Sequence, residues 1–485
     1  DFYYIAPQAM ERFCIPKNAF HDVMECHREF VYGPDYPLLK AEFKDLLSTD
    51  RSIHNMEYRW LDPKREPIWI NCRGYVVRDE NMKPLYMVEN GYLIRLGLDH
   101  FKEINENLGW EYGDQVLRET AVCISGCMSE NQTVYRLFSD EFMILDLSSR
   151  SVKEVKKLYD KVRESVDQFI RDNEYTVMFT ISGGILPLHA IEEMGYSAAM
   201  KLTDFSLNEA KKLGRNRCYV FEEKEYRQFL RRSELKQELR NAVINDFKGF
   251  TAFYQTVFRS ETGKLYGAEA LMRFISEKFG MVSPAEFIPI LEETGLIIPA
   301  GRWMMGEAMG KCSQIREVLP EFLVSINISQ VQAAKSDVIL DVIAAMEKAK
   351  LPADALIIEL TESDLLEQNI NERHFLTELQ RMKIKLALDD FGTGYSNFHY
   401  LSELGPAIIK IDRSFTASAV ADEGEYYLLN QFCSMIHNLN LKLCIEGVEN
   451  KEEWSKIRNL QPDFSQGFFW GRPCPYEEFV EKFVE

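Results

Sequence analysis

The C-terminal half of this chain contains seven short apolar runs, nearly all of which end in a carboxylate or an amide. In order they read YGAEALMR, LVSINIS, LIIELTES, IKLALDDFGTG, IIKIDRSF, LKLCIEGVE and FSQGFFWGRP. Seven such runs separated by helix-like sequence are typical of a (β/α) barrel, which builds its site at the carboxyl ends of its strands. The polar residues delivered in this way are Glu269, Asn327, Glu359, Glu362, Asp389, Asp390, Lys410, Asp412, Glu446, Glu449 and Gln466.

The side chains at these strand ends predict a site for divalent cations and phosphate esters. Hard cations prefer oxygen ligands, and two cations about 4 Å apart can clamp a phosphodiester. The tandem Asp389-Asp390 is the most informative pair, because adjacent carboxylates repel each other unless a cation or hydrogen bonds compensate. Lys410 and Asp412, two residues apart on one expected strand, should face the same side. A helix cap or an ordinary ion pair explains any one carboxylate more simply, but not the whole series.

The composition narrows the class of protein. The chain has 485 residues, 46% of them hydrophobic, and a formal net charge of -19. An acidic chain lacks the basic patches that bind nucleic acid, although a bound cation can invert the field around a small phosphate ligand. No apolar stretch approaches the roughly 20 residues that span a bilayer, and the ten cysteines include no CxxC pair. We therefore expect a cytoplasmic protein with reduced cysteines, no transmembrane segment and no nucleic-acid partner.

Changes of pattern along the chain predict an α/β protein of several domains. Residues 1–90 contain alternating apolar and polar runs broken at DPKREP and RDENMKP, which predicts antiparallel strands. This segment resembles a PAS sensor domain of the α+β class, and a generic α+β module is the alternative. Residues 91–222 alternate strands and helices as an α/β domain does. Residues 223–235 form a charged helical linker, and residues 236–485 hold eight strand candidates, from AFYQTVF to GFFWGR.

The C-terminal domain resembles a known family of enzymes. The motifs EALMR, NIS, ELTES, DDFGTGYS, KIDRSF, EGVE and QGFFWGRP are similar to those of EAL-domain phosphodiesterases over essentially all of residues 236–485. The resemblance implies a TIM-like barrel that hydrolyses cyclic di-GMP to linear pGpG at a two-metal site holding Mg²⁺ or Mn²⁺. Thr256, Asn397 and Ile445 stand where proline, serine and alanine are usual, and none of these departures removes a ligand.

The same resemblance assigns roles to residues of this chain. The implied ligands of the first metal are Glu269, Asn327, Glu359 and Asp389. The implied residues of the second metal and its water are Asp390, Asp412 and Glu446. The implied catalytic residues are Lys410, Glu446 and Glu362, the last of which anchors the DFGTGYSN loop at a dimer contact. The implied substrate contacts are Gln255, Glu269, Leu271, Arg273, Asp412, Glu449 and Gln466.

The middle domain, 91–222, resembles a GGDEF domain, the α/β fold of diguanylate cyclases. The similar motifs are LDHFKEIN, Gly113-Asp114, FSDEF, the SGG strand and AKKLGRNR. Asn105 and Asp114 fall where the family holds the guanine base. The resemblance therefore leaves open a bound GTP that regulates rather than reacts.

The departures in the middle domain argue against the family's cyclase chemistry. The signature begins Phe138-Ser139, so it lacks both glycines that let the hairpin backbone approach the GTP phosphates. Gly97 replaces the first aspartate of the usual metal pair, which leaves Asp99 and Asp140. We expect a regulatory or structural domain without cyclase activity.

Three hypotheses for the whole chain follow. The first is a cyclic di-GMP phosphodiesterase, a homodimer controlled by its PAS-like and degenerate GGDEF domains. The second is a non-catalytic receptor for cyclic di-GMP or GTP, which would have no need for Lys410 or the tandem aspartates. The third is a bifunctional enzyme, which Gly97 and Phe138 oppose. The helix that usually precedes the DHFK strand is missing near position 89, so either the protein lacks it or residues are absent there.

Overall fold

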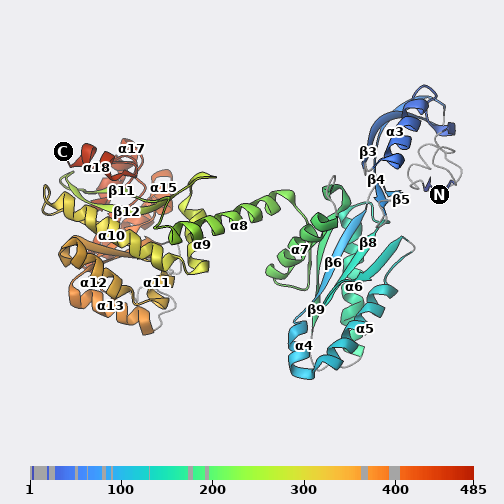
Figure 1. Ribbon diagram of the computed structural model, residues 1–485. Coiled ribbons are helices and arrows are strands. Elements are labelled where there is room, and N and C mark those ends of the chain that lie inside the picture. The colour runs from blue at the N-terminus through green and yellow to red at the C-terminus, as the bar shows by residue number, and fades with distance from the viewer. Residues whose placement is uncertain are drawn as a thin grey trace. The chain divides into compact units, whose positions relative to one another are not determined.

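The chain divides into two compact units, Asp1–Phe229 and Leu230–Glu485 (Figure 1). Among the residues that the structure describes, no helix has the length and apolar character that a membrane span requires. The computed structural model describes residues 3–4, 19–20, 28–49, 53–62, 64–78, 84–88, 91–129, 131–172, 179–191, 196–361, 370–392 and 405–484.

The N-terminal segment contains the expected antiparallel strands. Strands β3 (Ile53–Leu61), β4 (Pro67–Arg78) and β5 (Pro84–Val88) pair in that order. Helix α3 (Tyr36–Ser48) contacts β3 through its buried apolar face. A two-stranded pair, β1 (Tyr3–Tyr4) with β2 (Ala19–Phe20), precedes them.

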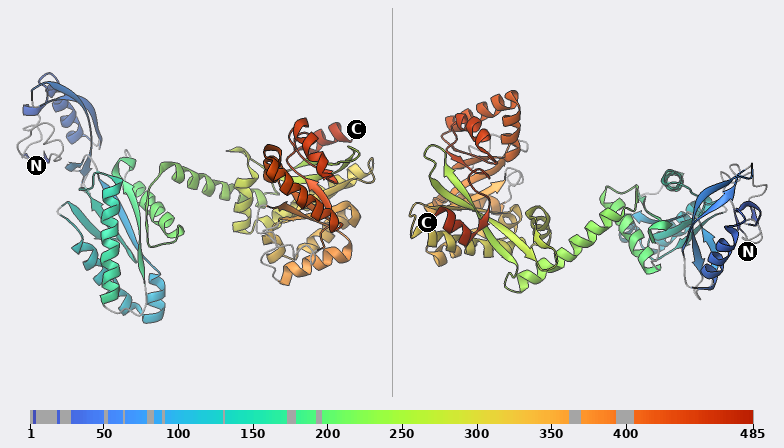
Figure 2. Two further views of the ribbon diagram at one scale, coloured as in Figure 1. Left: turned by 180° about the vertical axis from the view of Figure 1, so that it is seen from behind. Right: turned by 90° about the horizontal axis from the view of Figure 1, so that it is seen from above.

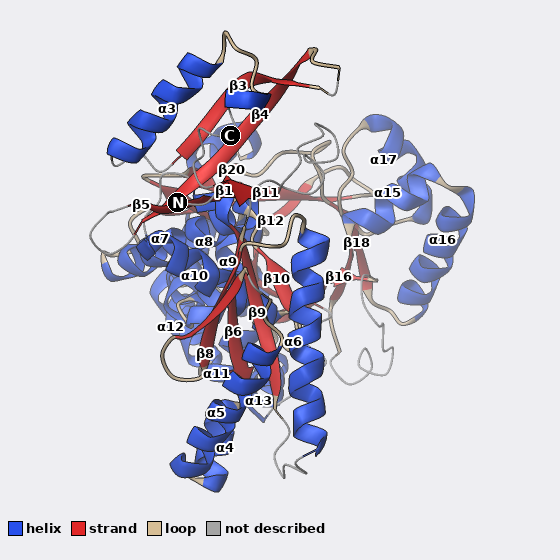
Figure 3. Cartoon of the chain, turned by 90° about the vertical axis from the view of Figure 1, so that its right-hand side faces the viewer, coloured by secondary structure: helices blue, strands red, loops and turns tan. Residues whose placement is uncertain are grey.

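The middle segment is a five-stranded sheet with helices packed on it. The strand order is β10-β9-β6-β8-β7, and β7 with β8 forms the expected hairpin. Helix α6 runs along this sheet (Figure 3). The strands are β6 (Tyr92–Asp99), β7 (Gln132–Arg136), β8 (Glu141–Asp146), β9 (Thr180–Pro187) and β10 (Cys218–Val220). The helices are α4 (Phe101–Leu108), α5 (Trp110–Gly126), α6 (Val152–Asp172) and α7 (Tyr196–Lys212).

Successive side chains of β6 point to opposite faces of this sheet, and different helices cover the two faces. Ile94, Leu96 and Leu98 are buried in one core with residues of α5 and α6. The opposite face packs against α7, and Gly184 of β9 lies directly under that helix. A Cβ atom built on Gly184 would lie 2.3 Å from the backbone nitrogen of Leu207. Only glycine permits so close an approach of strand and helix.

Helix α8 (Glu223–Ile244) includes the predicted linker and continues nine residues beyond position 235. The spacing of its apolar residues accounts for the extension, because Leu235, Leu239 and Ala242 are buried in a core of the second unit. On the same side, Arg231 makes two hydrogen bonds to Glu286, at 2.6 and 3.0 Å. The end of α8 is therefore a packed element of the barrel unit.

The second unit is a closed barrel of eight strands, as expected. Its strands follow the order β12-β14-β15-β16-β17-β18-β19-β11, and β11 also pairs with β12. Neighbours from β12 to β19 are parallel, whereas β11 runs antiparallel to both of its partners. The strands are β11 (Phe250–Arg259), β12 (Leu265–Ser276), β14 (Leu323–Asn327), β15 (Leu356–Thr361), β16 (Lys385–Phe391), β17 (Ile408–Ile411), β18 (Lys442–Ile445) and β19 (Phe464–Ser465).

Helices cover the outside of this barrel (Figure 2). The largest core of the unit joins apolar residues of the strands to those of α10, α12, α13 and α16. The helices are α9 (Pro284–Thr294), α10 (Ile297–Arg316), α11 (Gln330–Lys335), α12 (Val338–Ala349), α13 (Ile370–Met382), α15 (Arg413–Ala421), α16 (Glu423–Asn438), α17 (Lys451–Ile457) and α18 (Tyr476–Phe483). Two short edge strands are β13 (Gly280–Val282) and β20 (Cys474–Pro475).

The last barrel strand is not where the sequence suggested. GFFWGR was the expected strand, but β19 ends at Ser465 and the residues that follow Gln466 form a turn. Gly467 adopts φ 154° and packs so closely on Val448 that a Cβ would lie 2.1 Å from its carbonyl oxygen. The aromatic residues therefore line a turn after the strand, and Gln466 is the first residue beyond it.

Substituting Gly184 tests the packing of α7 on the middle sheet. We expect Gly184→Ala to destabilise this domain by about 1–3 kcal/mol, because the added methyl group forces the helix off the strand. Gly126→Ala is the control, since nothing lies within 4 Å of that position. Hydrogen exchange of peptides from β9 and α7 should accelerate only in Gly184→Ala. Unchanged exchange in that variant would contradict this packing.

Candidate active site

The parallel strands of the barrel bring the predicted polar residues to one end. Glu269 lies in β12, Glu359 in β15, Asp389 in β16 and Lys410 in β17. Because parallel strands point the same way, their carboxyl ends meet at one mouth of the barrel. The remaining members of the predicted set at this mouth are Asn327 at the end of β14, Glu446 after β18 and Gln466 after β19.

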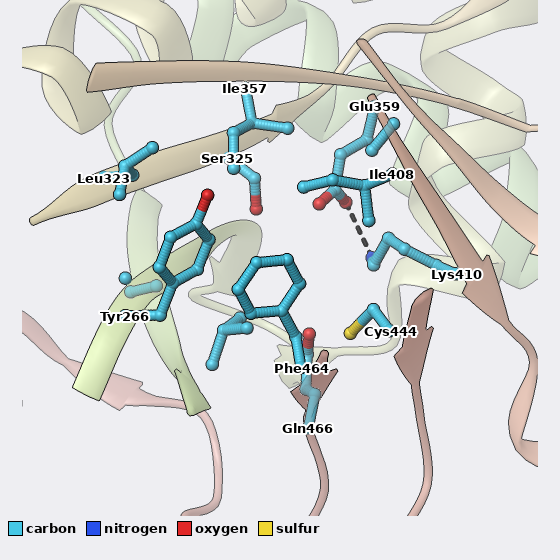
Figure 4. Close-up of a pocket in the computed structure, with 14 residues that line it drawn as sticks. Tyr266, Leu323, Ser325, Ile357, Glu359, Ile408, Lys410, Cys444, Phe464 and Gln466 are labelled. Atoms are coloured by element: carbon cyan, nitrogen blue, oxygen red, sulfur yellow. Dashed lines mark hydrogen bonds and ion pairs between the residues drawn. The ribbon is translucent and has the colours of Figure 1, made fainter. Parts of the chain in front are cut away.

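The ammonium group of Lys410 lies at the centre of four carboxylates. Its Nζ is 2.7 Å from Glu446, 2.8 Å from Glu359, and 3.2 Å from both Glu269 and Asp389. All of these except Glu446 are buried, and Glu446 is partly buried. Figure 4 shows the contact between Lys410 and Glu359 among the residues that line a pocket inside the barrel. Charges so far from water require partners at this distance.

Two amide side chains fix the carboxylate of Glu269. Asn327 Nδ2 donates to Glu269 Oε1 at 2.7 Å, and Gln466 Nε2 donates to Glu269 Oε2 at 2.7 Å. The same Gln466 nitrogen also donates to Gln255 Oε1 at 3.0 Å. The amides therefore orient the carboxylate from both sides and connect β11 to the site.

The charges at this centre shift its protonation equilibria. Burial disfavours the charged form of Lys410, but the four carboxylates outweigh it and raise the pKa of Lys410 well above its usual value. Burial acts against Glu269 in the same way, yet the charge of Lys410 and the amide hydrogen bonds bring its pKa below the ordinary value. Burial and the neighbouring carboxylates raise the pKa of Glu359 well above normal and that of Glu446 to about 8.

A bulge in β16 places both tandem aspartates in one site. In a regular strand, adjacent side chains point to opposite faces. The pairing of β16 with β17 is irregular between Leu388 and Phe391, and Asp390 adopts φ 51°. Such left-handed backbone is rare outside glycine and clusters at functional sites. Partial burial and the charges of Asp389 and Asp412 raise the pKa of Asp390 to about 6.

Two groups of carboxylates are close enough to hold metal ions. Ligand atoms of Glu269, Glu359 and Asp389 lie within 4.8 Å of one another, as do those of Asp389, Asp390 and Glu446. The two groups share Asp389. Oxygen donors suit hard divalent cations such as Mg²⁺ and Mn²⁺, so the donor set fits the predicted two-metal site.

Other predicted residues surround this centre without joining it. β17 ends at Ile411, so the expectation that Asp412 shares the strand of Lys410 is wrong. Asp412 caps α15 instead, accepting a hydrogen bond from Ser414 N at 2.8 Å. Glu449 makes an ion pair of 2.5 Å with Arg413, a residue that the sequence analysis did not single out.

The predicted substrate contacts on β12 face the rim. Leu271 and Arg273 are half-buried, and the Arg273 guanidinium lies 5.6 Å from the ring centre of Phe253. Burial lowers the pKa of Arg273, an effect that the charge of Glu269 opposes. Glu362 and most of the DFGTGYSN segment lie outside the described residues.

In the middle domain, the residues at the family's metal and phosphate positions do not form such a site. Asp99 is buried, and its carboxylate accepts hydrogen bonds from Thr180, Ser182 and the backbone of Asn216. A Cβ built on Gly97, where the family has its first metal ligand, would lie 3.0 Å from Lys211 Nζ. Phe138 is 61% exposed at the hairpin tip. The part of the predicted metal pair that remains is thus committed to internal hydrogen bonds.

The raised pKa of Glu446 predicts how the stability of the metal-free barrel depends on pH. Its pKa of about 8 lies above the usual value for glutamate, so the folded protein holds a proton that the unfolded chain releases. This contribution to stability is present at low pH and is lost as pH rises through about 8. We expect the free energy of unfolding, measured in chelator, to fall from about pH 4.5, the ordinary pKa of glutamate, to about pH 8 and then to level off.

In Glu446→Gln this fall should be smaller, since the amide does not titrate. A shallower slope, rather than none, is expected because the pKa of Glu359 is also raised. Identical slopes for the two proteins would contradict the protonation of Glu446.

Comparisons with known proteins identify the family of each part of the chain. Three family models match in series: a PAS fold over residues 4–90, a diguanylate cyclase GGDEF domain over 81–217 and an EAL domain over 236–473. Over 389 residues the chain is 30% identical to the bifunctional diguanylate cyclase/cyclic di-GMP phosphodiesterase MucR of Pseudomonas aeruginosa. The aligned region covers 79% of this chain and 56% of MucR.

A second relative, the signaling protein YkoW of Bacillus subtilis, is 32% identical over 405 residues, 82% of this chain and 49% of YkoW. The solved structure of the EAL enzyme Bd1971 in its cAMP-bound form matches with a TM-score of 0.50 and 25% identity, covering 62% of this chain and 80% of that one. The chain spans about half the length of the curated relatives it matches. It carries PAS, GGDEF and EAL domains in tandem and belongs to the GGDEF–EAL proteins.

Proposed function

We propose that the barrel is a phosphodiesterase that hydrolyses cyclic di-GMP to linear pGpG with two Mg²⁺ or Mn²⁺ ions. The observation that supports this most is the convergence of Glu269, Glu359, Asp389 and Glu446 on one ammonium group at the mouth. MucR, a relative of this chain, is named for both diguanylate cyclase and cyclic di-GMP phosphodiesterase activity. A purely binding barrel would have little use for so costly a cluster of buried charges.

The residues at the mouth divide into those that hold cations and those that hold substrate. Glu269, Asn327, Glu359 and Asp389 would ligate the first cation, and Asp390, Asp412 and Glu446 the second. When bound, the cations neutralise the phosphodiester and lower the pKa of a water molecule. Gln255, Leu271, Arg273, Glu449 and Gln466 would contact the dinucleotide, with Arg273 placed to pair with a phosphate oxygen.

In the proposed reaction, the oxygen of water forms a new bond to phosphorus as the bond to the ribose 3′ oxygen breaks. Glu446 accepts the proton of the water, and Lys410 offsets the charge that develops at phosphorus. The leaving 3′ oxygen takes a proton from solvent. Glu362, which lies outside the described residues, would anchor the DFGTGYSN segment, as the family resemblance implies.

We further propose that the first two domains regulate the barrel. Gly97, Phe138 and the internal hydrogen bonds of Asp99 support a GGDEF domain without cyclase activity. Asn105 and Asp114 stand where the family holds the guanine base, which supports a retained site for GTP. A homodimer through the DFGTGYSN segment would connect these domains to the activity of the barrel.

Removing one carboxylate tests the hydrolysis. We expect Glu269→Ala to lower the rate of pGpG production at least about a hundredfold, because it removes a ligand at the centre of the site. Glu277→Ala is the matched control, since this glutamate is exposed and pairs with the exposed Lys248. A chelator should abolish wild-type activity, and Mg²⁺ or Mn²⁺ should restore it. Tight binding of cyclic di-GMP without turnover would instead identify a receptor.

The absence of cyclase activity needs a separate test. In Glu269→Ala, any cyclic di-GMP formed from GTP would accumulate because its hydrolysis is blocked. We expect none to form in this variant, while GTP added to the wild type should change the rate of pGpG production. Accumulation of cyclic di-GMP would contradict the proposed loss of cyclase chemistry.

A further inference from the structure

Strands β11 and β12 extend together beyond the mouth of the barrel. The pairing of β12 with its other neighbour in the barrel, β14, ends at Ala270, whereas its pairing with β11 continues to Phe274. Because Glu269 of β12 already lies at the mouth, the residues that follow it stand above the carboxylates. This part of the two strands is therefore a wall beside any molecule that binds at the mouth.

One face of this wall is continuous with the site. Gln255 of β11 lies opposite Glu269, and Gln466 donates hydrogen bonds to both side chains. Side chains that lie opposite each other in an antiparallel pair share a face, and the same face recurs at every second residue. Phe253 and Leu271 are the next opposed pair on this face. They therefore stand one layer above Gln255 and Glu269.

Phe253 and Leu271 are apolar side chains that the barrel unit does not use for its own packing. The residues between the two faces alternate as expected, since Tyr254 and Ala270 are buried in the largest core. Phe253 and Leu271 are half-buried, and neither packs against the described apolar cores of this unit. In the part of the chain that the structure describes, the one ring contact of Phe253 is with the guanidinium of Arg273, 5.6 Å from the ring centre.

An aromatic ring in this position suits a nucleobase. Proteins that bind single-stranded nucleotides stack the flat faces of bases on aromatic side chains. A cyclic dinucleotide whose phosphate lies at the carboxylates carries its bases on either side of that phosphate. The wall above Gln255 and Glu269 is within reach of one of them. Arg273, which lies against the same ring, can pair with a phosphate oxygen beside that base.

We propose that Phe253 is the stacking platform for one guanine base of the dinucleotide. The base would lie on the ring of Phe253, with Leu271 at its edge and Arg273 on the neighbouring phosphate. Stacking contributes equally to binding of the substrate and of the transition state, so Phe253 would determine affinity rather than the rate of the chemical step. The inference rests on the proposed hydrolysis and adds a residue outside the motifs that identified the domain.

The kinetic constants of cyclic di-GMP hydrolysis test the platform. We expect Phe253→Leu to raise KM about tenfold and to leave kcat within about threefold, because the flat ring is lost. Phe253→Tyr keeps the ring and should stay within about threefold of the wild type in both constants. Phe279→Leu is the matched control and should leave KM unchanged. Its half-buried ring also lies against an arginine, Arg231 at 4.5 Å, but it packs against the core around α8.

A fluorescent variant reports stacking without turnover. Phe253→Trp keeps a flat ring, and cyclic di-GMP should quench its added emission, because a base stacked on an indole ring quenches its fluorescence. The wild type, which has six tryptophans at other positions, gives the baseline for this titration. Equal KM values for Phe253→Leu and the wild type, or unchanged emission of Phe253→Trp in saturating cyclic di-GMP, would overturn the platform and leave the proposed hydrolysis intact. A wild type that neither binds nor hydrolyses cyclic di-GMP would overturn both.

Discussion

The ion pairs of Lys410 with four carboxylates are the interaction on which the barrel site depends. Burying a carboxylate costs several kcal/mol unless a partner compensates, and four together add their mutual repulsion. One ammonium group cannot neutralise four negative charges. The excess appears as the raised pKa values of Glu359 and Glu446, while Glu269 stays ionised because two amides also hold it. The folded barrel is therefore short of positive charge where a divalent cation would supply it.

The rest of the mouth is shaped around this charge. The bulge in β16 brings Asp390 beside Asp389, although a regular strand would turn it away. Gln466 connects the closing strand β11 to Glu269 through Gln255. The buried Asp99 of the middle domain differs from these carboxylates, because hydroxyl and backbone groups donate hydrogen bonds to it. The excess charge in the barrel and the satisfied carboxylate in the middle domain agree with the proposed roles, in which the barrel reacts and the middle domain regulates.

Much of this architecture could be predicted from sequence, because strand-end carboxylates and turn residues are local patterns. The tandem domains, the antiparallel strands before β6 and the closed barrel were all confirmed. The antiparallel direction of β11, the bulge at Asp390 and the helix cap by Asp412 were missed, since they depend on pairing across the barrel. The roles of the site residues stay predictions.

The most direct test of the central claim is the hydrolysis of cyclic di-GMP in which sulfur replaces one non-bridging phosphate oxygen. If the carboxylates around Lys410 hold cations that contact the phosphodiester, the sulfur should slow the reaction strongly in Mg²⁺. The softer Mn²⁺ should restore much of the rate, because it accepts sulfur more readily. A loss of rate that is the same in both metals would show that no cation touches that oxygen and would contradict the account.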